Sequence, residues 1–401
     1  MSNIEVLKQR AERLESFLLV DPSNKDLLLD LANNHFDSGN HKRAIELYQN
    51  LAILDGEQAT LLSKLAAAYL GLNLWDEAIS ILQRAIELEP DTAILYFNLG
   101  YAEFSAQYLP AAKEHFSKAI YLEPNNANFH YYMALISQEL NDDETARKEY
   151  NKTLELGPEH VGAKLLLVLM DLESGKLDAA KKQTEAMLRM HPNEVEAIVL
   201  RAQIFMLEMD AQKAIALLRQ GQAINPNDAN LLTVLGQALL MLQRFKQAKE
   251  CFSKAISLQP NMLNAYTGLG WVELLQDNLT LAEHAFRRTF EFDNNDAEAH
   301  GGLAMVYASQ NNREMARKYA ASALMIDPAN VPALIVNIWE SKQENEAESE
   351  SLSKELLESN LFGPFGWKTK DLIDSVKDSP TGKRVIQKIS RRLSQKNNNS
   401  I

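Results

Sequence analysis

Several residue types are scarce in this chain of 401 residues, and each scarcity excludes a class of protein. A single cysteine, Cys251, excludes an intramolecular disulfide and a cysteine-based zinc cluster. Lys and Arg number 41 against 54 Asp and Glu, which gives a net charge of −13. Because phosphate contacts need an excess of cations, this balance argues against a nucleic-acid binder.

Long apolar runs are also missing. No stretch of about 18 apolar residues suggests a membrane span, and the first twenty residues lack the continuous apolar core of a signal peptide. Sixteen glycines and twelve prolines are too few for a loop-rich or disordered protein. With 46% hydrophobic residues, the chain can form a large buried core, and we expect a cytoplasmic protein.

What the chain does contain is a repeat. The stretch FSKAIYLEP at 116–124 returns as FSKAISLQP at 252–260, which is 136 positions later, or four steps of 34 residues. Gly56 and Asn294 occupy the two steps that lack proline. Prolines at steps of 34 or its multiples are Pro22, Pro90, Pro124, Pro158, Pro192, Pro226, Pro260 and Pro328. A fixed period of this length indicates an array of repeated supersecondary units.

Two further columns of small residues follow the same period. The first contains only alanine: Ala44, Ala78, Ala112, Ala146, Ala180, Ala214, Ala248, Ala282 and Ala316. The second lies twelve residues earlier and is small in eight of nine cases: Ala32, Ala66, Gly100, Ala134, Val168, Ala202, Gly236, Gly270 and Ala304. Two helices approach closely only where the contact residues are small, so these columns predict helix–helix contacts.

The spacing of the other residues predicts two antiparallel helices in each unit. Apolar residues recur three and four positions apart, which is the helical period. Each proline ends a helix, because it lacks an N–H and disfavours helix in the residue before it. Asn, Asp or Ser often follows within two residues and can cap the next helix. A polar break such as ELNDDE or SQNNRE divides each unit near its middle.

This pattern resembles the tetratricopeptide repeat family. The third repeat shows the family motif at Tyr96, Leu99, Gly100, Ala112, Phe116, Ala119 and Pro124, and the seventh shows most of it at Leu232, Leu235, Gly236, Ala248, Phe252, Ala255 and Pro260. The fifth repeat departs most from the motif. The resemblance implies an all-α fold, a right-handed α-solenoid of nine 34-residue helix-turn-helix repeats over residues 25–330. We expect residues 1–24 to contain an N-terminal capping helix.

Residues that could support catalysis do not stand out in the sequence. TGLG at 267–270 looks like a nucleotide loop, but Gly270 belongs to a packing column and no strand precedes it. The eight histidines are scattered, and Cys251 lies beside Phe252 on an apolar face. We therefore predict no enzyme, no catalytic residue, no cofactor and no metal site.

The surface that the repeats present is more informative. In the family, the fifth, ninth and twelfth residues of each first helix line a concave groove. Here these run from Leu29, Asn33 and Phe36 to Gly301, Met305 and Ala308 at 34-residue steps, and none of the 27 is charged. This face is either extended core or a groove for a hydrophobic or amphipathic protein segment. The predicted groove contacts are Phe97, Tyr101, Tyr131, Leu135, Leu169, Met206 and Trp271. Lys64 is the one cation among the sixth positions, which argues against binding of a partner's terminal carboxylate.

The C-terminal part departs from the period. Residues 331–366 read as a degenerate tenth repeat with an acidic run and an aromatic linker, and residues 367–401 as a basic helical segment with a disordered tail. This last part contains nine Lys or Arg and three Asp. Its helix either caps the array on the protein's own acidic surface, docks an acidic partner, or makes weak peripheral contact with a membrane. Its cations form a second candidate partner surface at Lys383, Arg384, Lys388, Arg391 and Arg392.

The sequence thus predicts a non-enzymatic protein-binding scaffold, such as an adaptor, a chaperone or an assembly factor. Two alternatives stay open. The chain could be a structural oligomer in which another copy fills the groove, or a regulatory subunit of a complex for secretion, envelope assembly or polysaccharide export. Because tetratricopeptide repeats serve many pathways, the fold cannot choose among them.

Overall fold

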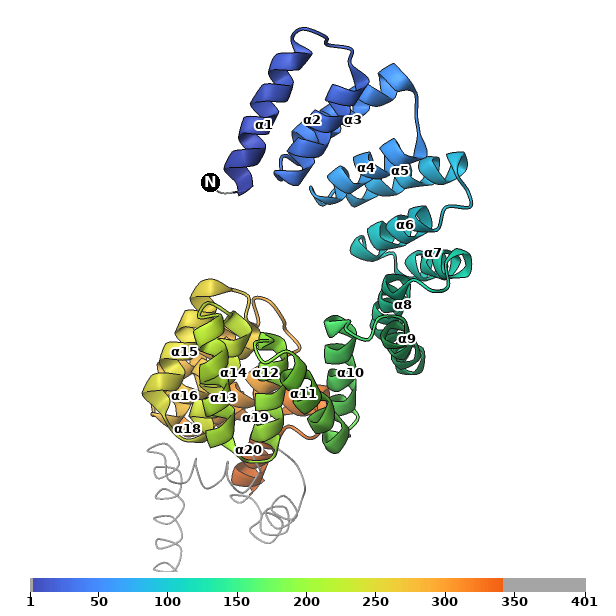
Figure 1. Cartoon of the computed structure of the whole chain (residues 1–401). Helices are drawn as coiled ribbons and strands as arrows, with labels where there is room; N and C mark the ends of the chain where they lie inside the picture. Colours follow the sequence, from blue (N-terminus) through green and yellow to red (C-terminus); the bar gives the residue numbers. More distant parts are fainter. Residues whose placement is uncertain (1–2, 342–401) are drawn as a thin grey trace, which may run out of the picture. The chain divides into compact units, whose positions relative to one another are not determined.

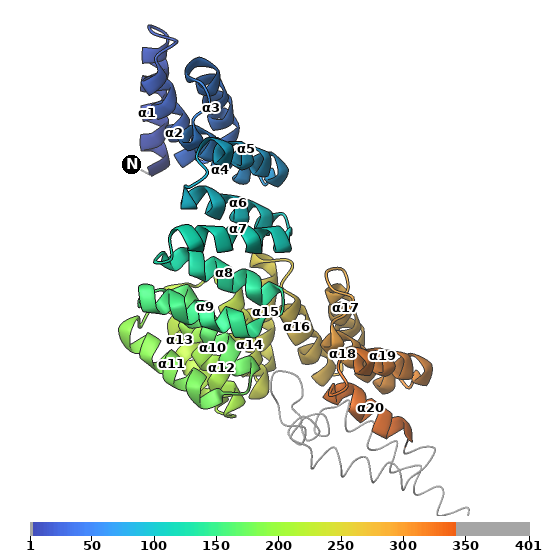
Figure 2. The same ribbon diagram turned by 90° about the vertical axis from the view of Figure 1, so that its right-hand side faces the viewer.

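The computed structural model of the chain describes residues 3–341 and contains only helices there, α1 to α20 (Figure 1). The helices fall into two compact units, residues 1–170 and residues 171–401, which we call unit 1 and unit 2. Successive helices pack as pairs joined by short turns, as Figure 2 shows from a second direction. The prediction of an all-helical solenoid built from helix pairs is confirmed.

Unit 1 begins with α1 (Asn3–Leu18), which packs against α2 where we expected a capping helix. The helix pairs that follow are α2 (Lys25–Asp37) with α3 (His41–Asp55), α4 (Ala59–Leu70) with α5 (Trp75–Leu88), α6 (Ala93–Ser105) with α7 (Leu109–Leu122), and α8 (Ala127–Glu139) with α9 (Asp143–Leu156). The boundary between the units falls within α10 (Val161–Glu173).

Unit 2 continues the same alternation. Its helices are α11 (Leu177–Met190), α12 (Val195–Leu207), α13 (Ala211–Ile224), α14 (Ala229–Met241), α15 (Phe245–Leu258), α16 (Leu263–Leu275), α17 (Leu279–Thr289), α18 (Ala297–Ser309), α19 (Arg313–Ile326) and α20 (Val331–Ser341). The last helix, α20, packs against both α18 and α19.

The turn inside each helix pair has the same conformation throughout. One residue at each 34-residue step has a positive φ between 56° and 78°. These residues are Gly39, Asn73, Gln107, Asn141, Gly175, Met209, Gln243, Asp277 and Asn311. Only two are glycine, so most turns adopt the left-handed conformation despite the cost to a residue with a Cβ. The regularity of the turn keeps the two helices of each pair in a constant register.

The alanine column lies in the core, as the sequence predicts. All nine of its members, from Ala44 to Ala316, are 0% exposed. In the neighbouring column, a Cβ on Gly100 would lie 2.9 Å from the Phe116 ring. Small residues are therefore required where the two helices of a pair meet, because a larger side chain would overlap the facing helix.

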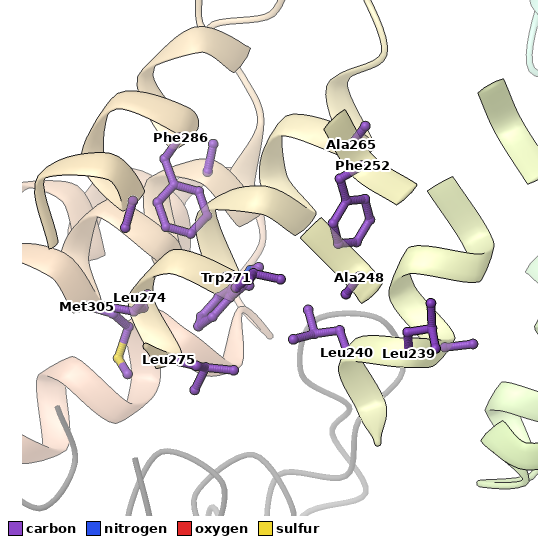
Figure 3. Close-up of a cluster of buried hydrophobic side chains, with 14 of the residues drawn as sticks. Leu239, Leu240, Ala248, Phe252, Ala265, Trp271, Leu274, Leu275, Phe286 and Met305 are labelled. Atoms are coloured by element: carbon purple, nitrogen blue, oxygen red, sulfur yellow. The ribbon is translucent and has the colours of Figure 1, made fainter. Parts of the chain in front are cut away.

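Unit 2 has one large core in which aromatic rings lie between glycines (Figure 3). A Cβ on Gly236 or Gly268 would lie 2.7 or 2.3 Å from the nearest atom of the Phe252 ring. Gly270 and Gly302 flank Phe286 in the same way, at 2.6 and 2.4 Å. Each ring thus fills the space between two successive first helices, and α16 contacts both α14 and α18.

One charged residue interrupts the core of unit 2. Arg201 on α12 stands in a column that is leucine or methionine in the other repeats, and its side chain is only 7% exposed. Its Nη2 donates to Glu185 Oε1 at 2.9 Å, its guanidinium lies 4.0 Å from the centre of the Phe205 ring, and its Nη1 is buried without a hydrogen-bond partner.

We predict that Arg201→Leu leaves the free energy of unfolding unchanged or raises it by about 1–2 kcal/mol, because a buried ion pair rarely recovers the cost of its desolvation. The matched change Glu185→Ala should lower stability, since it leaves the buried cation unpaired. Urea denaturation followed by circular dichroism measures both. A loss above about 2 kcal/mol for Arg201→Leu would contradict this prediction.

The remaining C-terminal predictions fall on residues that the structure does not describe. The acidic and aromatic linker beyond residue 341 and the helix of residues 367–401 lie outside the described part of the chain. The candidate partner surface formed by Lys383, Arg384, Lys388, Arg391 and Arg392 also lies there and stays a prediction.

Candidate functional site

The first helices of unit 1 present a continuous uncharged face. Residues five, nine and twelve of α2, α4, α6 and α8, together with the fifth and ninth of α10, contribute fourteen side chains to it, and all are partly exposed. We call this face the first-helix surface. Its members are Leu29, Asn33, Phe36, Ser63, Ala67, Leu70, Phe97, Tyr101, Phe104, Tyr131, Leu135, Gln138, Leu165 and Leu169. Because α4 contacts α6 and α6 contacts α8, the side chains form one strip rather than separate patches.

Aromatic rings form the centre of this strip. Phe97 and Tyr101 on α6 meet Tyr131 and Tyr132 on α8. The Tyr132 ring lies 5.2, 5.6 and 5.5 Å from the rings of Phe97, Tyr101 and Tyr131, with interplanar angles of 80–86°. Such edge-to-face pairs stabilise one another beyond the area that they bury. The structure therefore brings together three of the predicted contacts around a fourth residue.

Tyr132 was not among the predicted groove contacts. It occupies the sixth position of its first helix, where the eighth and ninth repeats have Gly268 and Gly302. In those repeats the facing phenylalanine packs directly against the glycine. In unit 1 the equivalent ring, Phe116, instead lies 5.9 Å from the Tyr132 ring. Reading the sixth positions for size rather than for charge would have identified this residue.

Tyr131 extends the aromatic cluster toward α10. Its ring lies 4.4 Å from that of His160, and a Cβ on Gly162 would lie 3.0 Å from the Tyr131 hydroxyl. Glycine at position 162 thus makes room for the phenol. Burial raises the pKa of Tyr131 and of Tyr132, so both hydroxyls remain protonated donors at neutral pH. Leu135 and Leu169 continue the strip as partly exposed apolar side chains.

The N-terminal end of the first-helix surface is polar. Asn33 Oδ1 accepts from the Tyr48 hydroxyl at 2.8 Å and from Lys64 Nζ at 3.2 Å. Asn98 Nδ2 donates to Ser63 Oγ at 3.1 Å. Lys64 therefore already has an internal partner, so the face combines amide and hydroxyl groups at one end with aromatic and aliphatic groups at the other.

In unit 2 the equivalent face is closed. Met206 and Trp271, two of the predicted groove contacts, are 4% and 1% exposed and belong to the hydrophobic cluster of that unit. Leu240, Leu274 and Met305, which occupy the same repeat positions, are also buried. The alternative expectation of extended core describes these residues, so we leave Met206 and Trp271 out of the candidate surface. The reason is local packing, since the Trp271 ring lies edge-on to Phe286 at 5.7 Å.

Behind the aromatic cluster, a polar pair joins α6 to α7. Glu103 is 4% exposed, and its Oε2 lies 2.7 Å from His115 Nδ1. This hydrogen bond raises the pKa of His115. A pKa that is higher in the folded than in the unfolded state stabilises the fold below about pH 6.5, and the stabilisation is lost as the pH rises through the folded value.

We therefore predict that the stability of the wild-type chain relative to His115→Gln falls between pH 6 and pH 8. Urea denaturation of both proteins at the two pH values measures this difference. If the difference is the same at both values, the His115–Glu103 pair does not titrate in the way that its geometry indicates.

Within residues 3–341, no group of three or more His, Cys, Asp or Glu side chains is placed to hold a metal ion. Burial raises the pKa of the Cys251 thiol, which disfavours the reactive thiolate. No helix in the described part of the chain is long and apolar enough to cross a membrane. The chemistry that the described surface offers is thus apolar contact and hydrogen bonding.

Helix pairs with a regular 34-residue period and an uncharged first-helix face define a helical-repeat binding protein. Three sequence models, each described as a tetratricopeptide repeat, match the chain at 35–99 with 205–270, at 165–229, and at 93–126 with 297–330. Together they cover more than half of the chain, which therefore belongs to the tetratricopeptide repeat family. Proteins of this family are in general scaffolds that bind other proteins. None of the curated proteins matches the chain significantly.

Solved structures show the same fold. A tetratricopeptide repeat protein from Parabacteroides merdae is 17% identical, with a TM-score of 0.52 over 62% of this chain and 98% of its own. MamA is 25% identical over 40% of this chain and 98% of its own, with a TM-score of 0.36. A chain of the APC/C hetero-tetramer Cut9–Hcn1 is 16% identical over 82% of this chain and 58% of its own, with a TM-score of 0.46.

Proposed function

We propose that the protein is a non-enzymatic scaffold, an adaptor, chaperone or assembly factor, that holds a partner protein's apolar or amphipathic segment on the first-helix surface of unit 1. The supporting observation is that all fourteen side chains of this surface are uncharged and partly exposed, whereas most equivalent positions in unit 2 are buried. An exposed apolar strip of this length favours an interaction site, because it would otherwise promote aggregation.

The aromatic cluster is the expected centre of recognition. Tyrosine offers a large rigid contact area and a hydroxyl donor, and such residues dominate the binding energy of many interfaces. Phe97, Tyr101 and Tyr131 are held by ring contacts within unit 1, so little side-chain freedom is lost on binding. Leu135 and Leu169 would add apolar contacts beside them.

Site-specific photo-crosslinking in the native cell tests the proposal. A photoreactive phenylalanine analogue at Tyr131 should capture a discrete partner band that mass spectrometry can identify. The same analogue at Tyr121, which is 77% exposed on α7, serves as the control. A partner captured from Tyr121 and not from Tyr131 would contradict the proposal. Capture of a second copy of this chain from Tyr131 would instead establish the structural oligomer.

A further inference from the structure

A pocket of about 680 Å³ opens on unit 1 between α3, α4 and α5, and it does not involve any side chain of the first-helix surface. Ile53 on α3, Leu62 and Leu65 on α4, and Ile81 on α5 give it an apolar lining. Ile53 is 81% exposed at its rim.

The pocket exists because two side chains are shorter than their counterparts in the next repeats. One repeat later, Tyr96 and His115 occupy the positions of Leu62 and Ile81, and their rings stack 6.3 Å apart. Two repeats later, His130 and Glu149 occupy them and lie 2.6 Å apart. In the second repeat neither aliphatic side chain extends far enough to fill this space, so an apolar floor stays open.

Carboxylates predominate at the rim. Glu57 is paired with Arg84, which is the only basic residue of the lining. Asp76 accepts a hydrogen bond from the Tyr108 hydroxyl at 3.2 Å and keeps its charge. Glu77 is exposed and makes no ion pair within the described residues. The rim therefore has three carboxylates against one guanidinium, within a unit that contains 25 Asp or Glu and 14 Lys or Arg.

The chain itself contains a segment of complementary chemistry. Residues 382–396, GKRVIQKISRRLSQK, include six Lys or Arg and no acidic residue. Val385, Ile386, Ile389 and Leu393 recur at helical spacing between these cations. The 40 residues between Ser341 and this segment can span up to roughly 130 Å when extended, so chain length places little restriction on its docking site.

We propose that the pocket between α3, α4 and α5 binds the chain's own basic segment, residues 382–396. The apolar side chains of the segment enter the pocket above Leu62 and Ile81, and its cations meet Asp76 and Glu77 at the rim. Neither a charged pocket alone nor an apolar one alone would select this segment, because the match requires both properties at one place.

The test uses a full-length variant in which Lys383, Arg384, Lys388, Arg391 and Arg392 are changed to Gln, so that its own segment no longer competes. A fluorescein-labelled peptide of residues 382–396 is then titrated with this variant, and anisotropy reports binding. We expect saturable binding that weakens with added salt. Wild-type chain should bind the peptide at least tenfold more weakly, because its own segment occupies the pocket.

Two further substitutions in that variant locate the site. Ile53→Arg should weaken peptide binding at least tenfold, because it removes the apolar rim and repels the cations. Tyr121→Arg, at the same repeat position and 77% exposed, should have no effect. Both positions are on the surface, so both variants should keep their helical circular dichroism.

Three outcomes would overturn the proposal. The first is the absence of peptide binding, and the second is binding that Ile53→Arg leaves unchanged. The third is a wild-type mass that doubles with concentration in light scattering and returns to that of a monomer in Ile53→Arg, because a second copy would then supply the segment. None of these results bears on the first-helix surface, so this proposal and the proposed function fail separately.

Discussion

Replacing Trp271 by alanine is expected to lower the free energy of unfolding of unit 2 by about 3–5 kcal/mol. The side chain is 1% exposed and belongs to the large core around Phe252 and Phe286. Its removal would leave a cavity between first helices that pack against one another. Urea denaturation followed by circular dichroism measures the loss.

The matched change Trp271→Phe separates packing from hydrogen bonding. The indole Nε1 of Trp271 is buried without a hydrogen-bond partner, so the smaller aromatic ring gives up no such bond. We expect a cost well below that of alanine, about 1–2 kcal/mol. If Trp271→Ala were as stable as the wild type and lost its partner, Trp271 would be a binding residue, as the sequence suggested.

The double variant Tyr101→Asp with Tyr131→Asp is expected to weaken binding of the partner at least about a hundredfold, since central aromatic residues often contribute 2 kcal/mol or more each. Both side chains are partly exposed, so the helices should remain folded. Each substitution places a charge on a face that has none among its fourteen members. Titration of the captured partner with each protein gives the affinities.

The control for this prediction is Tyr121→Asp, which adds one charge to an exposed site on α7. Its affinity should equal that of the wild type. Equal affinities for the double variant and the wild type, with helix content retained in both, would remove the first-helix surface from recognition.

Much of the fold could be predicted from residue spacing alone. The alanine column, the small column before it and the prolines repeat at one period, and a period shared by several columns leaves few alternatives to stacked helix pairs. The burial of Ala112 and Ala248 follows directly, because each lies where two helices come closest. Periodicity is a local property, so a single sequence contains it in full.

The open and closed parts of the first-helix face could not be separated in this way. Tyr101 and Trp271 occupy the same repeat position, and both looked like aromatic groove contacts. Their exposure depends on neighbours: Tyr101 lies beside Tyr132, whereas Trp271 packs against Phe286 in a unit where Gly268 and Gly302 let the helices approach. The pocket was missed for a related reason, since it results from two side chains that are too short.

Hydrogen–deuterium exchange of the chain with and without its captured partner tests the central claim most directly. The account predicts slower exchange in α6 and α8 when the partner is bound, and unchanged exchange in the exposed C-terminal turn of α7 that includes Tyr121. Protection confined to second helices, or to unit 2, would contradict the assignment of recognition to the first-helix surface of unit 1.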